Sequence, residues 1–463
     1  MLGLLVYAHL CGIRLADAAA ASAEQNWPQW RGPLGTGIAP AASPPVTWSE
    51  TNNLRWKVKL PGNGTATPIV WGNRIFVQTA IPTGRKVEAP PEPSASPSPA
   101  AAEGASTNAG APAGRRSGGR GGGMRAARPT EVHQFVLLCL DRQTGRTLWQ
   151  QTAREEVPHE AHHRTEGSFA SSSPLTDGQR VFAFFGSRGL YCHDIDGKLQ
   201  WRQDFGDMRI VMSFGEGSSP ALYRDTLIVN WDHEGESFII ALDKHTGKTL
   251  WKNARDERTS WSTPLVVEHE GKPQVVVSAT GKIRSYDPSS GNLLWECAGL
   301  TRNVIPTPVT ADGMLYATSG YQGNALLAIR LGRQGDLTGT DAIVWSHKKS
   351  TPYVPSPLLY SGRLYFFANN NAILSCLDAR SGRVLVDAAR IEALQGVYAS
   401  PVGAGGRVYL VGRNGATVVL KPSDNLEVLA TNRLEEKIDA SPAVAGNELF
   451  LRGREYLYCI AEQ

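Results

Sequence analysis

The chain has 463 residues, and 47 Lys and Arg against 43 Asp and Glu give it a formal net charge of +4. This excess comes from residues 82–130, which contain seven Lys or Arg and three Glu, so the rest of the chain is close to neutral. A neutral chain has no general electrostatic attraction for nucleic acid, and we expect no nucleic-acid partner. Beyond the N-terminal region no apolar stretch is long enough to span a bilayer.

The N-terminal segment has the pattern of a signal for export. Residues 1–23 contain an apolar run followed by small residues, with a plausible cleavage site after Ala23. We therefore expect a periplasmic or extracellular protein. Cys11 lies in a Leu-Cys-Gly sequence similar to a lipid-attachment site, but the large Leu10 stands where a small residue is normal, so we expect no lipid anchor. Residues 24–47 form an N-terminal extension before the first repeat.

A turn between two strands recurs along the chain. In the sequence ALDKHTGKTLW, residues 241–251, Asp243 can accept backbone hydrogen bonds and Gly247 can take the positive φ of a tight hairpin. The flanking apolar and β-branched residues favour strands. Copies with glycine four residues before the last position end at Trp149, Trp201, Trp251 and Trp295, and weaker copies end at Trp345 and Val386.

A second marker, Ser or Thr followed by Pro, opens a strand in each repeat. From the second marker onward the spacing is 41 to 49 residues, whereas the first spacing is 106 residues, one repeat plus an insertion. The markers end at Pro68, Pro174, Pro220, Pro264, Pro308, Pro357, Pro401 and Pro442. A period near 45 with about four short strands is typical of a propeller blade, so the eight markers predict eight blades.

The last blade lacks one strand at the C-terminus, and the start of the chain supplies a candidate. Asn52 precedes Trp56 by four residues, the spacing of the repeated turn. We predict an all-β, eight-bladed propeller of four-stranded antiparallel blades over residues 48–463, closed by this N-terminal strand, which removes an exposed sheet edge. Residues 82–130, rich in Pro, Ala, Gly and Arg, should be a disordered insertion in blade one.

The cysteines are predicted to be free and buried. Equivalent strands of neighbouring blades should lie too far apart for disulfides, and no pair has the spacing of a zinc site. Four cysteines occupy the same repeat position, in the strand before the turn: Cys139, Cys192, Cys376 and Cys459.

Two polar loops contain the candidate metal ligands. The first is VPHEAHHRTEG, with His159, His162 and His163, and the second is NWDHEGE, with Asp232 and His233. Imidazole suits zinc, copper or iron. If the loops of these adjacent blades meet at one mouth of the ring, they form a mixed histidine and carboxylate site. Otherwise they are solvated loops, because the spacing follows no known metal-binding motif.

Residues just before the Ser/Thr-Pro markers are the candidate ligand-binding residues. The innermost strand of each blade lines the axis of a propeller, so side chains that precede it could ring one mouth of the channel. Oxygen ligands of the kind that Ca²⁺ prefers and aromatic rings that suit a flat cofactor, a sugar or a peptide occur here. The candidates are Glu216, Trp261, Asn303, Tyr353, Tyr398 and Asp439. The alternative is that they cap strands and pack the inner ends of the blades.

The repeat unit SP…DGxxY…LDxxTGxxLW resembles the repeats of the pyrroloquinoline quinone (PQQ) β-propeller family, and the resemblance covers about residues 48–463. It implies the propeller fold. One branch of the family contains quinoprotein alcohol dehydrogenases, which hold PQQ and Ca²⁺ on the ring axis. Another contains non-catalytic propellers, among them the lipoprotein scaffold of the outer-membrane β-barrel assembly machinery.

The sequence favours the non-catalytic branch. The related dehydrogenases carry adjacent cysteines near the cofactor, and this sequence has no Cys-Cys pair. It also has no Gly-x-Ser-x-Gly elbow and no phosphate-binding Gly-x-x-x-x-Gly-Lys motif. We expect an exported, monomeric protein that binds a protein or small-molecule ligand at the axial mouth. The sequence does not identify a cofactor, and PQQ with Ca²⁺ is not expected. The alternative is a PQQ- and Ca²⁺-dependent oxidoreductase.

Overall fold

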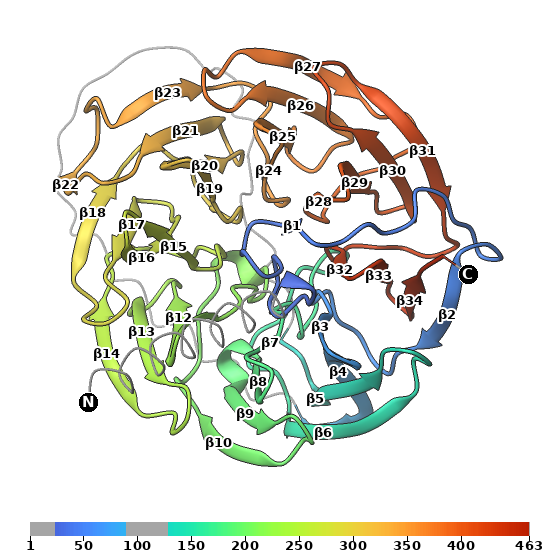
Figure 1. Cartoon of the computed structure of the whole chain (residues 1–463). Coiled ribbons are helices and arrows are strands. Elements are labelled where there is room, and N and C mark those ends of the chain that lie inside the picture. Colours follow the sequence, from blue (N-terminus) through green and yellow to red (C-terminus); the bar gives the residue numbers. More distant parts are fainter. Residues whose placement is uncertain (1–23, 89–127, 463) are drawn as a thin grey trace, which may run out of the picture.

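The computed structural model describes residues 24–88 and 128–462, and these form a ring of eight sheets around a central axis (Figure 1). The predicted signal peptide and most of the predicted insertion lie outside the described residues. The insertion begins later than expected, because residues 82–86 still belong to the long strand β4. The predicted eight-bladed, all-β propeller is confirmed.

Each blade is built on a four-stranded antiparallel sheet, and in blades one to seven these four strands follow one another outward from the axis in chain order. In blade eight the outermost strand comes from the N-terminal part of the chain. Blades one to four contain β3 (Ile69–Trp71), β4 (Arg74–Lys86), β5 (Glu131–Asp141) and β6 (Thr147–Glu156); β7 (Leu175–Thr176), β8 (Arg180–Phe184), β9 (Leu190–Asp194) and β10 (Leu199–Gln203); β11 (Ala221–Tyr223), β12 (Thr226–Trp231), β13 (Phe238–Asp243) and β14 (Thr249–Ala254); and β15 (Leu265–His269), β16 (Lys272–Val277), β17 (Ile283–Tyr286) and β18 (Leu293–Cys297).

The other four blades complete the circle. Blades five to eight contain β19 (Val309–Ala311), β20 (Met314–Ser319), β21 (Ala325–Arg330) and β23 (Ile343–His347); β24 (Leu358–Tyr360), β25 (Arg363–Phe367), β26 (Ile373–Asp378) and β27 (Val384–Arg390); β28 (Val402–Ala404), β29 (Arg407–Val411), β30 (Ala416–Lys421) and β31 (Glu427–Arg433); and β32 (Ala443–Ala445), β33 (Glu448–Arg452), β34 (Tyr456–Ile460) and β2 (Leu54–Lys59). Two short strands add in parallel: β22 (Gly335–Asp336) beside β18 and β1 (Ile38–Ala39) beside β28.

The N-terminal strand closes the ring as predicted. β2 pairs antiparallel with β34, and Trp56 lies opposite Cys459 in the register. This pairing hides the outer edge that β34 would otherwise expose to other chains. The cysteine prediction is also confirmed within the described residues, where five cysteines are free and buried.

The Ser/Thr-Pro markers form a ring of hydrogen bonds around the axis. Seven of the eight pairs of neighbouring blades are joined in the same way. The backbone N–H of the marker Ser or Thr in one blade donates to the hydroxyl of the marker in the next blade, with N···O distances of 2.9 to 3.1 Å. At the eighth junction the Thr67 hydroxyl donates to the Ser441 carbonyl, 3.1 Å away. All eight markers are buried: Thr67, Ser173, Ser219, Thr263, Thr307, Ser356, Ser400 and Ser441.

The repeated tryptophans join blades farther from the axis. The Trp201 indole packs on Gly247 of the next blade, and its N–H donates to the Lys244 carbonyl, 3.0 Å away. Four other tryptophans, Trp56, Trp149, Trp251 and Trp345, make the same pair of contacts with the following blade. Trp295 instead donates to Gln274 of its own blade. The stretched turn of blade five, in which β22 lies, explains this exception.

The N-terminal extension crosses one face of the ring. Trp27 is fully buried and bridges to Val70 of blade one. Farther along, the Arg31 guanidinium donates to the carbonyls of Pro357 and Pro401 in blades six and seven. Because blade one is separated from blades six and seven by two or three of the eight positions, the segment between these contacts crosses the inner part of the ring. Figure 1 shows β1 close to the centre of the ring.

Within the described residues, no helix combines the length and apolar character needed to cross a membrane. The helical segments are two short 3-10 turns, η1 (Gly186–Arg188) and η2 (Val211–Ser213). η1 lies between β8 and β9 of blade two, and η2 lies in the connection between blades two and three, near the candidate site.

The marker ring predicts a specific loss of stability. Ser356→Ala removes the acceptor of the buried Thr307 N–H, so the free energy of unfolding should fall by about 1–3 kcal/mol, the cost of leaving a buried donor without a partner. Ser356→Thr keeps the hydroxyl, and threonine already occupies three equivalent positions, so it should stay close to wild type. Urea or thermal unfolding measures both. Equal stabilities of the alanine and threonine variants would contradict the role of the ring.

The contact between Gly247 and Trp201 makes a second prediction. Both Gly247 (φ +72°) and Gly271 (φ +70°) adopt the left-handed conformation, but an added Cβ would lie 2.7 Å from the Trp201 ring at Gly247 and in open space at Gly271. Gly271→Ala therefore isolates the backbone strain. Gly247→Ala should lose about 1–3 kcal/mol more, because the indole must move. Thermal unfolding compares the two variants, and equal losses would show that the indole contact contributes nothing.

Candidate functional site

The candidate site is a cavity on the ring axis that encloses about 290 Å³. Each blade contributes the residue three positions before its marker proline, which the marker ring holds at the axis. Going around the ring, these residues are Thr65, Ser171, Gly217, Trp261, Ile305, Val354, Tyr398 and Asp439. We call this space the axial cavity.

The N-terminal extension closes one end of the axial cavity. Trp30 lines the cavity, and the next residue, Arg31, is buried and donates to three backbone carbonyls, those of Thr36, Pro357 and Pro401. Burial lowers the pKa of Arg31 to about 9. The cavity is therefore a cup with a closed floor, and a ligand must enter from the other face. Sequence reasoning missed this floor, because the extension has no repeat.

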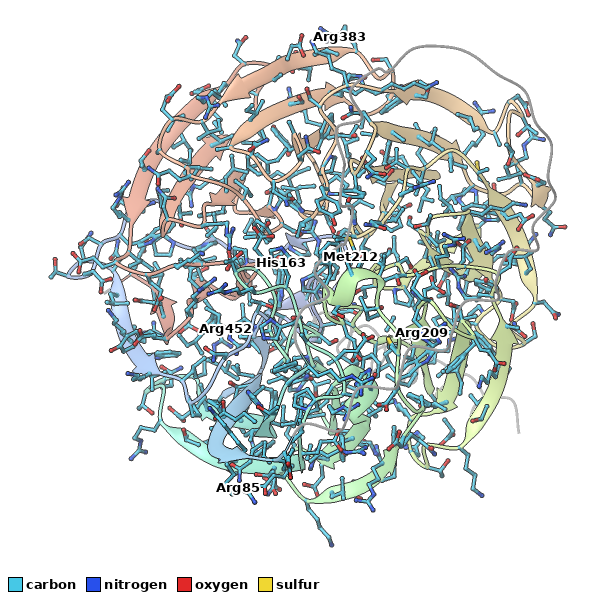
Figure 2. All side chains as sticks on the ribbon, turned by 180° about the vertical axis from the view of Figure 1, so that it is seen from behind. Arg85, His163, Arg209, Met212, Arg383 and Arg452 are labelled. Carbon is cyan, nitrogen blue, oxygen red and sulfur yellow. The ribbon has the colours of Figure 1, made fainter. Side chains whose placement is uncertain are left out.

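Two loops partly cover the open face, and we call them the mouth loops: residues 157–174 and residues 204–220. The His163 N–H donates to the Phe214 carbonyl, which joins the loops to each other. In Figure 2, seen from the side opposite to Figure 1, His163 and Met212 lie near the centre of the ring. Arg413 of blade seven and Arg454 of blade eight donate to the carbonyl of Thr165. The first loop thus reaches across the mouth.

A strained turn sets the second mouth loop. Met212 and Ser213 are consecutive non-glycine residues in the left-handed region, with φ of 52° and 53°. This conformation is costly, and it concentrates at functional sites. It directs Phe214 into the cavity while the Met212 side chain is 59 % exposed at the mouth.

Aromatic rings form a large part of one region of the cavity wall. Tyr321 and Tyr353 stack with ring centroids 4.9 Å apart. Trp261 is held by a hydrogen bond from its indole N–H to the Gly215 carbonyl, 2.7 Å long. Tyr398 lies under the Arg413 guanidinium, whose carbon is 4.1 Å from the ring centre. Three of the predicted residues, Trp261, Tyr353 and Tyr398, therefore line one cavity, together with Tyr321, which sequence reasoning missed.

The two predicted carboxylates also line the cavity, but both have partners. Glu216 accepts from the N–H and the hydroxyl of Ser187. Asp439 accepts from Arg413, with Oδ1 2.5 Å from Nε, and the same arginine contacts Glu166 at 3.3 Å. Burial raises the pKa of Glu216 above its ordinary value, against the hydrogen bonds from Ser187.

Asn303 does not line the axial cavity. It lies five residues before its marker, and its backbone N–H donates to the Thr280 hydroxyl, 3.1 Å away. Its side chain is a neighbour of Tyr353. Burial raises the pKa of the Tyr353 phenol to about 12, and the contact with Asn303 opposes that shift. The structure thus places Asn303 beside the wall of the cavity.

The candidate metal ligands are not brought together. Both candidate loops bond to residues 208–210, which lie between them: His159 Nε2 is 2.6 Å from the Met208 carbonyl, and the Arg209 N–H donates to His233 Nδ1. The Asp232 carboxylate is fully buried in an ion pair with Arg255. The described residues contain no group of three His, Cys, Asp or Glu positioned to hold a metal ion.

The remaining two histidines have different surroundings. His162 Nδ1 lies 2.9 Å from the His163 carbonyl, its ring meets Phe169 edge-on, and burial lowers its pKa. His163 lines the axial cavity, and its Nδ1 is 3.5 Å from a Glu166 carboxylate oxygen. Only His163 of the five metal candidates reaches the cavity.

The donor set of the cavity does not fit PQQ with Ca²⁺. Calcium takes six to eight oxygen ligands, whereas Glu216 is bonded to Ser187, and Glu166 and Asp439 share Arg413. PQQ is an anion with several carboxylate groups. The described residues that line the cavity include three carboxylates and no Lys or Arg, so they offer an anion no counter-charge.

Comparisons with known proteins agree with the fold. A family model described as outer membrane protein assembly factor BamB matches residues 133–387, more than half of the chain. Solved structures with a similar fold include quinohemoprotein alcohol dehydrogenase from Comamonas testosteroni, with 11% identity, coverage of 96% of this chain and 84% of that chain, and a TM-score of 0.57. Quinohemoprotein alcohol dehydrogenase ADHIIG from Pseudomonas putida HK5 has 10% identity, coverage of 96% and 81%, and a TM-score of 0.55.

The structure of BamB from Moraxella catarrhalis has 15% identity, covers 72% of this chain and 92% of that chain, and has a TM-score of 0.48. None of the curated proteins matches the chain by sequence. These identities show a shared fold and leave the function to the chemistry of the cavity.

The buried Glu216 predicts a pH-dependent stability difference. Because its pKa is raised in the folded state, the folded chain keeps a proton that the unfolded chain releases, so stability from this group falls as the pH rises above the unfolded value of about 4.3. Glu216→Gln cannot ionise. Its melting temperature relative to wild type should therefore rise between about pH 4 and pH 8. The exposed Glu392→Gln serves as a control and should show no trend, and a trendless Glu216→Gln difference would contradict the burial effect.

Proposed function

We propose that this chain, which belongs to the PQQ-repeat β-propeller family, is an exported binding protein that takes a ligand or partner at its axial mouth without catalysis. The observation that carries this proposal is the axial cavity. The N-terminal extension closes one end of it, and aromatic rings line its wall together with hydroxyl and carboxylate groups that can orient a ligand. The match to a family described as an assembly factor supports a binding role.

The titratable groups around the cavity support a role without chemistry. A general acid or base must be within hydrogen-bond reach of the group that it acts on. Asp439 and Glu166 are instead paired with Arg413, and Glu216 with Ser187. The cavity is thus lined by acids that already hold partners, and this arrangement favours recognition by shape and hydrogen bonding.

An oxidoreductase dependent on PQQ and Ca²⁺ remains the alternative function, and the cavity supports it less well. The fold of the chain agrees with the quinohemoprotein structures. However, the carboxylates of the cavity are bonded to other protein groups, and no Lys or Arg is among the described residues that line it. The export proposal rests on residues 1–23, which lie outside the described residues.

Two measurements test the proposed function. In equilibrium dialysis against PQQ with Ca²⁺, followed by the absorbance of the quinone, the purified chain should retain no quinone at micromolar concentration, and dye-linked alcohol oxidation should be absent.

In ligand-observed NMR with a panel of flat aromatic and sugar-ring compounds, at least one class should bind and should lose its signal in Tyr353→Ala. Tyr223→Ala, a tyrosine outside the cavity, serves as the control.

Quinone binding with turnover would establish the oxidoreductase instead. If no compound of the panel binds, or if the bound compounds respond equally to both tyrosine substitutions, the axial cavity is not a ligand site and the proposed function fails.

A further inference from the structure

The charges around the axial cavity exclude two classes of ligand. An anion would meet three carboxylates and, among the described residues of the lining, no Lys or Arg. A cation would compete with Arg413, which already occupies the face of Tyr398 at 4.1 Å and bonds both Glu166 and Asp439. Arg454 adds a second positive charge 3.5 Å from Asp439. Glu166 and Asp439 are thus paired with the two arginines, and the third acid, Glu216, is bonded to Ser187, so the charges around the cavity favour a neutral ligand.

The inner end of the cavity provides uncommitted hydroxyl groups. Ser219, Ser400 and Ser441 line the cavity and belong to the marker ring, in which each hydroxyl oxygen accepts the N–H of the preceding blade. Each is nine-tenths or more buried. Within the described residues, these three hydroxyls have no acceptor for their own hydrogen. A ligand oxygen can supply that acceptor, and a buried polar group gains most from a partner.

Aromatic rings surround these hydroxyls on the wall. The stacked pair Tyr321 and Tyr353 and the fixed indole of Trp261 present flat apolar surfaces to the cavity. A ligand that satisfies both surfaces has an apolar face of C–H groups and an edge of oxygen atoms. A pyranose ring has this composition, since its ring hydrogens form an apolar face and its hydroxyls project around the edge.

We infer that the axial cavity binds an uncharged sugar ring, which stacks on the wall formed by Trp261, Tyr321 and Tyr353 and accepts hydrogen bonds from Ser219, Ser400 and Ser441. This inference rests on the proposed function and names its ligand class. The cavity volume of about 290 Å³ lies at the lower end of the range for small-molecule pockets, so it suits one or two rings. The closed floor excludes a long chain threaded through the axis.

Three sugars that share a ring and differ in charge test this inference. Glucose, glucuronate and glucosamine are respectively neutral, anionic and cationic at pH 7, and ligand-observed NMR titration gives the affinity of the full chain for each. N-Acetylglucosamine and galactose extend the neutral set. We expect at least one neutral sugar to bind at millimolar or lower concentration, and both charged sugars to bind at least tenfold more weakly.

Two serines of the marker ring provide the matched variants. Ser400→Ala and Ser356→Ala each remove one hydroxyl of the ring, but only Ser400 lines the cavity. Ser400→Ala should weaken sugar binding about fivefold to tenfold, the loss of one neutral hydrogen bond. Ser356→Ala should leave the affinity within twofold of wild type, although both variants lose stability. Equal affinities of the two variants would overturn the assignment of the hydroxyls.

The outcomes separate this inference from the proposed function. If aromatic acids or amines bind and depend on Tyr353 while no neutral sugar does, the cavity is a ligand site of another class and only the sugar inference fails. If no compound binds, both fail. A sugar that binds equally to wild type and Tyr353→Ala binds elsewhere, and this result also overturns the inference.

Discussion

The structure depends on the ring of hydrogen bonds between Ser/Thr markers. At the inner end of a blade the first N–H has no partner strand, because the sheets fan outward from the axis. The marker hydroxyl of the next blade supplies the acceptor, at 2.9 Å between Thr307 and Ser356 for example. An unpaired buried N–H is costly, so each bond fixes the separation of two blades. The ring therefore determines the size of the axial cavity.

The same ring holds the residues beside it in place without fixing their identity. The residues three positions before each marker proline lie next to the ring but are not part of its hydrogen bonds. Side chains as different as those of Gly217, Trp261 and Asp439 therefore occupy equivalent positions. Their chemistry can vary while the ring remains unchanged. An open ring would still leave a channel through the molecule. Trp30 and Arg31 close it, and Arg31 does so through backbone carbonyls of two blades.

Much of the fold and part of the site can be predicted because their causes are local and repeated. Gly247, with φ +72°, and Trp251 four residues later have a spacing that recurs in most copies, and the structure explains it, because such a tryptophan packs on the equivalent glycine of the next blade. Trp261, Tyr398 and Asp439 share a register with the markers, so their common location follows from the period. Asn303 lies two residues farther from its marker, and that shift moves it out of the cavity.

The parts that could not be predicted involve contacts without a period. The bond between Arg413 and Glu166 joins residues 247 positions apart, and the floor formed by Trp30 comes from a segment outside the repeats. The partners of the histidine loop could not be predicted for a different reason. Backbone carbonyls are abundant where loops cross, and His159 and His162 bond to them. A histidine can bind a metal, but whether it does so depends on which groups lie within its reach, and here these groups are backbone carbonyls.

The state of the polar groups in the cavity argues for recognition over catalysis. His163 is the lining group best suited to proton transfer, and its buried Nδ1 lies 3.5 Å from Glu166, which is itself paired with Arg413, without a hydrogen bond among the described residues. The marker hydroxyls also have unused hydrogen-bonding capacity, but their proton is too weakly acidic to serve as a general acid near neutral pH. Those hydroxyls are also held rigid by the fold, so a ligand meets donors that need no rearrangement. Preorganised donors on a rigid wall strengthen binding by lowering the entropy lost on association. Under the function that we propose, such a cavity selects a ligand by fit, and the serine hydroxyls that close the ring contribute to its specificity.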